Sequence, residues 1–212
     1  MKVKIAVESA PKKVFVTAID WPGWSRSGKT EALAIESLLG HADRYAAVAR
    51  RVGETFPDRA NIELEVVDRT TGGAGTEFGV PGNVSEPDRR RTTKADAERL
   101  ARLVRAAWDA FAETAAAAPE SLRKGPRGGG RDTSKVVSHV EESDHAYARE
   151  VGLKLKELID AVRAAVLDVL RQPSDGSPLA GRRWTARYAA HRIAWHALDH
   201  AWEIEDRTEP AR

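Results

Sequence analysis

The residues best suited to chemistry lie near the C-terminus, in a stretch from 188 to 205 that holds three of the six histidines. The stretch is rich in Ala and free of Gly and Pro, so it is predicted to form a helix. His196 and His200 are four residues apart, which stacks their imidazoles on one helical face. Two imidazoles at this spacing can bind one metal ion if another segment supplies a third ligand. An isolated pair also fits two partly buried histidines that are satisfied by hydrogen bonds.

A third histidine in a suitable context occurs within residues 133–151, which are also predicted to be helical. His139 borders the apolar stripe of this helix, whereas His145 lies away from it. His139 can therefore face the interior into which His196 and His200 point. Three neutral imidazoles suit Zn, Ni or Fe and leave at least one coordination position open. We predict a divalent-metal site made of these three histidines.

Two further sets of polar residues could act beside this site. Glu203 shares the face of the histidines, where it could orient a ligand or accept a proton as a catalytic base, with a salt bridge as the open alternative. Arg127 and Arg131 lie in a basic, glycine-rich loop that leads into the His139 helix. Such a loop can bind an anion, for example a substrate carboxylate, although a solvated loop without a ligand is the alternative.

These side chains need a scaffold, and the chain changes character near residue 85. Strands are predicted at 3–7, 14–19 and 62–67, and helices at 30–51, 93–118, 133–151, 154–171 and 185–206. The predicted fold class is α+β, with a small ββαβ N-terminal module in front of an antiparallel four-helix bundle. We predict domains at 1–84 and 94–212, joined by a linker at 85–93.

The helical half resembles the DinB-like family of metal-binding four-helix bundles. The resemblance rests on the run S-K-V-V-S-H-V-E around His139 and on W-H-A-L-D-H-A-W-E-I around His196 and His200. It implies that these three histidines bind a divalent metal. The family includes transferases and isomerases that use a low-molecular-weight thiol, among them mycothiol- and bacillithiol-dependent enzymes. Because this chain has no cysteine, any thiol must be external, and its Arg- and Ala-rich composition, typical of a GC-rich genome, makes mycothiol the candidate.

Residues 1–70 resemble a second family, the HicB-like antitoxin fold. The carrying residues are D-W-P-G-W from Asp20, where that family shows D-L-P-G-C, and S-G-K-T-E-A from Ser27, where it shows G-x-T-x-E-E-A. That family continues into a short DNA-binding segment, whereas this chain continues into the helical half. The resemblance implies a module that binds a protein partner or supports a homodimer.

The segment from Gly23 to Thr30 also matches the phosphate-binding pattern G-x4-G-K-T. A nucleotide-binding domain of that type needs several parallel strands alternating with helices, and only one further strand is predicted after this segment. We therefore predict a turn here, with Trp21 and Trp24 covering the small module and no role for Lys29 in nucleotide binding.

Composition excludes several other functions. The net charge of +2 is evenly spread, so no nucleic-acid partner is expected. The absence of cysteine excludes disulfides and thiolate metal sites. No apolar run approaches the roughly 20 residues that span a bilayer, and the N-terminus lacks a signal-peptide core, so no membrane association is expected and the predicted location is the cytoplasm.

Together these features predict a metal-dependent enzyme of the DinB-like type. Its three-histidine site would activate an external thiol or water, which makes it a thiol transferase or isomerase, or a hydrolase, acting on a small-molecule substrate. The alternative is a non-enzymatic binding or regulatory protein, in which the HicB-like module binds a partner and the bundle is structural.

Overall fold

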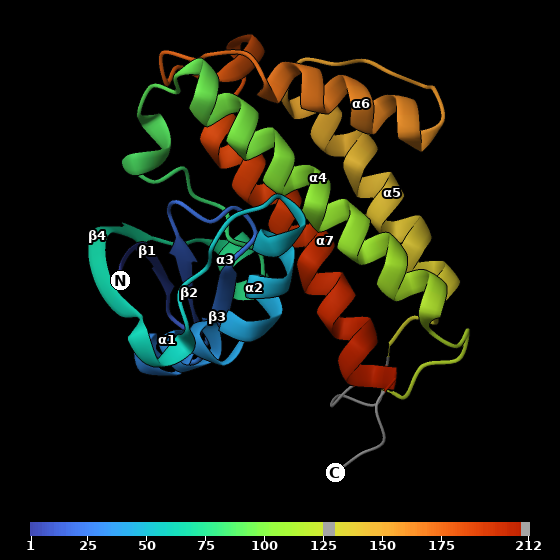
Figure 1. The fold of residues 1–212 in the computed structure, drawn as a ribbon, viewed down its shortest axis with the longest axis horizontal. Coiled ribbons are helices and arrows are strands. Elements are labelled where there is room, and N and C mark those ends of the chain that lie inside the picture. The colour runs from blue at the N-terminus through green and yellow to red at the C-terminus, as the bar shows by residue number, and fades with distance from the viewer. Residues whose placement is uncertain (125–129, 209–212) are drawn as a thin grey trace.

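The computed structural model describes residues 1–124 and 130–208, and it confirms the predicted α+β class. A four-stranded sheet lies at the N-terminal side, and the longest helices form the other side of the molecule (Figure 1). The described residues also include three short 3-10 helices, η1 (Arg59–Asn61), η2 (Pro87–Arg89) and η3 (Leu179–Gly181). Among them, no helix combines the length and the apolar character needed to cross a bilayer.

The sheet is mixed and has the order β3-β2-β1-β4. Its strands are β1 (Lys2–Ala10), β2 (Lys13–Ala18), β3 (Ser25–Gly28) and β4 (Glu63–Thr71). The three consecutive strands pair antiparallel, while β1 and β4 pair parallel. A parallel pair needs a long crossover, and helices α1 (Glu31–Gly40) and α2 (Ala42–Arg51) provide it. Val3, Ile5 and Val7 alternate along β1 and are buried, as expected for a strand with one face on a core.

The prediction of one helix over residues 30–51 is wrong, because the chain breaks between α1 and α2. Thr30 caps α1 by accepting a hydrogen bond from the Leu33 backbone N–H at 3.3 Å. At the break His41 has φ −101° and ψ 7°, and its N–H donates to the Leu38 carbonyl. Gly40 precedes it and is a poor helix former, so the turn tightens there and α2 leaves in a new direction.

The segment predicted as a turn contains the edge strand β3. Ser25 and Ser27 are paired with β2, so their backbone groups complete a sheet instead of wrapping a phosphate. Gly23 precedes the strand with φ +92°, and a Cβ there would lie 2.8 Å from Leu198 Cδ1. Only glycine combines this backbone conformation with this close approach. The Trp24 indole is fully buried and donates to the Leu38 carbonyl at 3.0 Å.

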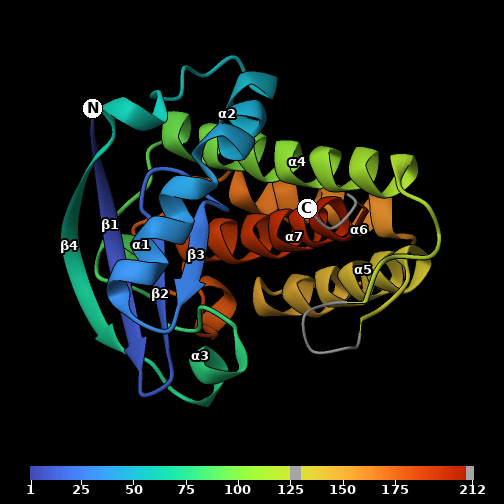
Figure 2. The same ribbon diagram turned by 90° about the horizontal axis from the view of Figure 1, so that it is seen from below.

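The C-terminal half contains α4 (Lys94–Ala117), α5 (Thr133–Glu150), α6 (Ile159–Leu170) and α7 (Ala186–Thr208). Helix α7 is central: α4 runs along it, α5 and α6 also contact it, and the sheet lies at its other side (Figure 2). The predicted start of α6 at residue 154 is wrong, since residues 153–158 are not helical. One cause is local: the Glu157 carboxylate accepts the Lys156 backbone N–H at 2.7 Å, which competes with helix formation.

The segment 85–93, predicted as a linker, is tied to both halves of the molecule. Asp88 is buried in η2 (Pro87–Arg89) and accepts hydrogen bonds from the Ser85 hydroxyl at 2.6 Å and backbone N–H at 3.0 Å. Thr185 donates from its hydroxyl to the Asp88 carbonyl at 2.8 Å. The hydrophobic core is also continuous, with Val16 and Leu100 in one cluster of buried residues. The division into domains stays a prediction that limited proteolysis can test.

Candidate metal centre

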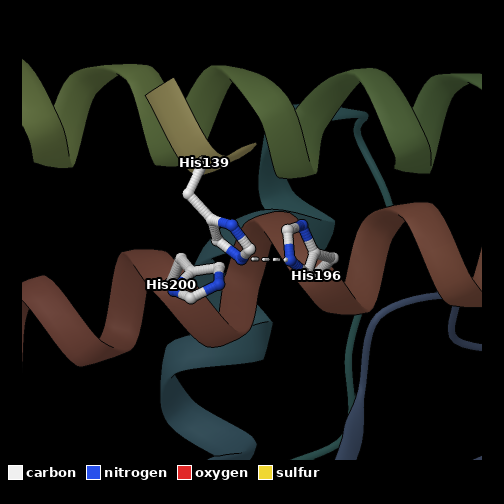
Figure 3. A group of neighbouring side chains, drawn as sticks. All are labelled: His139, His196 and His200. Carbon is white, nitrogen blue, oxygen red and sulfur yellow. Dashed lines mark hydrogen bonds between the residues drawn. The ribbon is translucent and has the colours of Figure 1, made fainter. Parts of the chain in front are cut away.

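Helix α7 carries two histidines into the interior, and α5 supplies the third. His196 is 6% exposed, and His139 and His200 are half-buried. The ring centroids of His139 lie 5.1 Å from His196 and 4.9 Å from His200, and the latter two are 4.6 Å apart. Figure 3 shows the three rings converging from the two helices, with two nitrogens facing each other. The structure therefore brings together the three residues that the sequence singled out.

The nitrogen positions suit a common cation. His139 Nε2 and His196 Nε2 are 3.3 Å apart. Two imidazole ligands at about 2.0–2.1 Å from one tetrahedral zinc ion would have their nitrogens about 3.3 Å apart. One ligand atom from each of the three histidines lies within 4.8 Å of the others. The His139–His196 pair thus has the spacing of two ligands, and His200 supplies the third ligand atom of the group.

Glu203 determines which nitrogen of His200 is available. His200 Nδ1 lies 2.8 Å from Glu203 Oε2, and Glu203 Oε1 accepts from Arg207 Nη1 at 3.0 Å. A carboxylate only accepts hydrogen bonds, so Nδ1 carries a proton, and in a neutral His200 ring the lone pair would lie on Nε2. A carboxylate on the far nitrogen is the usual companion of a metal-binding histidine. The hydrogen bond from His200 and the Arg207 charge hold the pKa of Glu203 below its usual value.

The surroundings favour the neutral form of His139 and His196. Burial, followed by the charges of His200 and Arg192, lowers the pKa of His196 to about 2. Burial also lowers the pKa of His139, with the charges of His200 and Arg131 adding to the effect. A neutral imidazole is the form that binds a metal. His196 Nδ1 is buried and has no hydrogen-bond partner among the described residues.

The predicted anion-binding residues are only partly placed. Arg131 is exposed, yet close enough for its charge to lower the pKa of His139 and His196. Arg127 lies outside the described residues. Glu203 forms a salt bridge with Arg207 and a hydrogen bond with His200, while its predicted roles in orienting a ligand or acting as a catalytic base stay predictions.

Sequence reasoning missed two residues that bear on the site. Arg207 holds Glu203 from one turn further along α7. Arg192 lies one turn before His196 and contacts the Tyr147 and Trp195 rings. Both are separated by four residues from a residue already under consideration, so the i, i+4 rule could have found them.

No family model, curated protein or solved structure matches this chain. The resemblances to the DinB-like and HicB-like families therefore stay predictions, and the function is argued from the site.

Proposed function

We propose that this protein is a metal-dependent enzyme of the DinB-like type, in which α4, α5, α6 and α7 form an antiparallel four-helix bundle around a three-histidine site. His139, His196 and His200 would hold a divalent ion, with Zn, Ni and Fe as the candidates. The observation that carries the proposal is the convergence of three ligand atoms within 4.8 Å of one another.

The chain's own residues have distinct roles in this proposal. The three imidazoles would hold the ion, and Glu203 keeps a proton on His200 Nδ1, which would leave Nε2 as the ligand atom. Arg207 positions Glu203 by a 3.0 Å hydrogen bond. When bound, such an ion supplies a Lewis acid that lowers the pKa of a coordinated water or thiol. Because the sequence has no cysteine, the thiol would be an external cofactor such as mycothiol.

The N-terminal module supports the site in this proposal instead of acting as a separate recruiting domain. Arg26 of β3 forms a 2.7 Å ion pair with Asp199, the residue before His200. Gly23 packs against α7 at Ala194 and Leu198, which lie two residues before and two residues after His196. These contacts hold the helix that carries two of the three ligands. They favour the enzyme over the regulatory alternative, in which the module would present its surface to a partner.

The test is metal content and its link to stability. Purified protein should contain close to one equivalent of Zn, Ni or Fe by elemental analysis. After chelation, added Zn at about 100 times its Kd should stabilise the fold by about 2.7 kcal/mol. For a protein of this size, each kcal/mol of added stability raises Tm by about 2–4 °C. Protein that neither contains nor takes up a metal would refute the proposal.

A Co²⁺-loaded sample separates the two nucleophiles. If an external thiol takes the open coordination position, adding it should create a sulfur-to-metal charge-transfer band. The same thiol added to a His200→Ala sample should leave the spectrum unchanged. A wild-type spectrum that is unchanged by thiol, but changes with pH, would assign water as the nucleophile.

A further inference from the structure

A cavity lies close to the cluster of His139, His196 and His200, between the two halves of the molecule. It has a volume of about 380 Å³, within the range of small-molecule sites. Tyr147 of α5 and Arg192 of α7 form one wall, and the glycine-rich segment 73–82 with the short helix α3 (Ala74–Phe78) forms the opposite wall. In Figure 2 α3 lies beside the lower end of the sheet, in the lower part of the view together with α5. Trp184 and Tyr188 add aromatic surface.

Arg192 is the unusual residue in this cavity. It is only 9% exposed, and its Nη1 atom is buried with no hydrogen-bond partner among the described residues. Its guanidinium lies over two rings, 5.1 Å from the Tyr147 centroid and 4.6 Å from the Trp195 centroid. These contacts hold the cation in place but leave a donor unsatisfied. A buried cation with an unpaired donor destabilises a fold unless an anion compensates it.

Arg192 forms no ion pair with a described residue, although it also lines a small pocket of about 30 Å³ together with Glu8 and Asp88. No acidic side chain is among the described residues that line the cavity, and Arg183 adds a second cation at its exposed edge. The nearby Glu8 is already engaged, since it accepts hydrogen bonds from the Thr76 hydroxyl and the Asn83 backbone N–H. Glu8 therefore holds the 73–83 segment in position as a wall and does not neutralise the cavity.

Two residues that line the cavity, Arg192 and Tyr147, also lie close to His196. Arg192 and His196 are one helical turn apart on α7, which places their Cβ atoms about 5–6 Å apart. Tyr147 joins the two places, because its ring centroid is 5.5 Å from that of His196. A molecule anchored at Arg192 and lying along Tyr147 would have its other end near the imidazoles.

We propose that this cavity binds the carboxylate of a small organic acid, with Arg192 as the anchoring residue and a flat, unsaturated or aromatic body against Tyr147, Trp184 and Tyr188. A guanidinium presents two parallel N–H donors that match a carboxylate, and the aromatic walls suit a planar body. The inference rests on the proposed function for the identity of the ligand as a substrate. In this proposal Arg192, and not the basic loop around Arg131, binds the carboxylate.

The test uses benzoate as the probe and benzamide, its neutral isostere, as the control ligand. Calorimetric titration of the full-length protein should show saturable benzoate binding and at least tenfold weaker benzamide binding. Titrations on chelated and metal-loaded protein should agree, because the anchor is Arg192 and not the ion. Benzoate that binds no better than benzamide, or only to the metal-loaded form, would overturn the inference.

Variants of Arg192 test whether its guanidinium binds the carboxylate of benzoate. Arg192→Met should weaken benzoate binding at least 30-fold while Tm stays the same or rises, since an unpaired buried charge is removed and the stem is kept. Arg192→Lys, which retains the charge but not the paired donors, should bind about tenfold more weakly. Arg187→Met, on the same helix but outside the cavity, should bind as the wild type does. Wild-type affinity in both Arg192 variants would overturn the inference.

Metal content separates this inference from the proposed function. Protein that holds metal but not benzoate retains the metal site and overturns only the carboxylate site. Protein that binds benzoate through Arg192 but takes up no metal retains the carboxylate site and refutes the metal-dependent enzyme.

Discussion

Helix α7 carries two buried histidines, His191 and His196, whose surroundings differ. His191 faces the sheet module, where its Nε2 lies 3.0 Å from the Ile19 carbonyl. His196 faces α5, where its Nε2 lies 3.3 Å from His139 Nε2. A carbonyl only accepts, so it pairs with the proton of His191 and satisfies that nitrogen. Two imidazole nitrogens that face each other can each act as donor or acceptor, depending on the tautomer, and both could serve as ligands of one cation.

Burial therefore does not distinguish the surroundings of His191 from those of His196. Burial is the main cause that lowers the pKa of His191, although Asp88 acts in the opposite direction from 3.6 Å, and burial is also the main cause at His196. Both imidazoles are neutral at neutral pH. What distinguishes the candidate metal centre is the group that faces the Nε2 atom, which is a backbone carbonyl at His191 and another imidazole at His196.

Removing one of the three clustered histidines should have the largest effect on metal affinity. His200→Ala should lower the metal affinity by more than about 100-fold, because loss of a ligand exceeds the 10–100-fold effect of losing its hydrogen-bonding companion. His191→Ala should keep the metal but lose about 1–3 kcal/mol of stability, since the Ile19 carbonyl is left buried and unpaired. Competition with a chromogenic chelator measures the first effect and urea unfolding measures the second.

His145→Ala is the matched control for the ligands, because His145 lies on the same helix as His139 but is not in the cluster. It should change neither quantity. If His145→Ala, His191→Ala and His200→Ala all lost metal equally, the loss would reflect general destabilisation, and the distinction between the two faces of α7 would fail.

A smaller effect is expected at the carboxylate behind His200. Glu203→Gln keeps the size of the side chain but no longer holds the Nδ1 proton of His200 with a charge. Metal affinity should fall about 10–100-fold, with little change in the stability of the metal-free protein. The same chelator competition measures it, and an affinity equal to the wild type would restrict Glu203 to its salt bridge with Arg207.

The smallest expected effect is on the pH dependence of stability, in which His191 and His196 should behave alike. The unfolded protein protonates histidine near pH 6.5, while His196 with a pKa of about 2 stays neutral in the fold. Between these values the unfolded state binds more protons, so the stability of metal-free protein falls as pH decreases below 6.5. His196→Leu should make this slope shallower by up to about 1.4 kcal/mol per pH unit.

His191→Leu should change the slope in the same direction, because burial lowers its pKa too. Urea unfolding at several pH values between 4.5 and 7 measures both variants. A His196→Leu slope that equals the wild-type slope would show that His196 is protonated in the metal-free fold.

Much of the scaffold was predictable because it depends on local pattern. The strands β1, β2 and β4, and helices α4, α5 and α7, follow from periods of two and 3.6 residues along the chain. The grouping of His139 with His196 and His200 was predictable for the same reason, since each lies on or beside the apolar stripe of its helix. That the group binds metal stays a prediction.

The tertiary structure decided the features that depend on residues far apart in sequence. Strand β3 forms because β2 offers it an edge, and the break at His41 lets α2 pack against α4. His191 and His196 are both buried on one helix, but the Ile19 carbonyl faces Nε2 of His191 and another imidazole faces Nε2 of His196. The cavity at Arg192 exists only because Glu8 holds a glycine-rich segment opposite α7. Sequence pattern determines which face a residue occupies, but only packing of distant segments determines what that face meets.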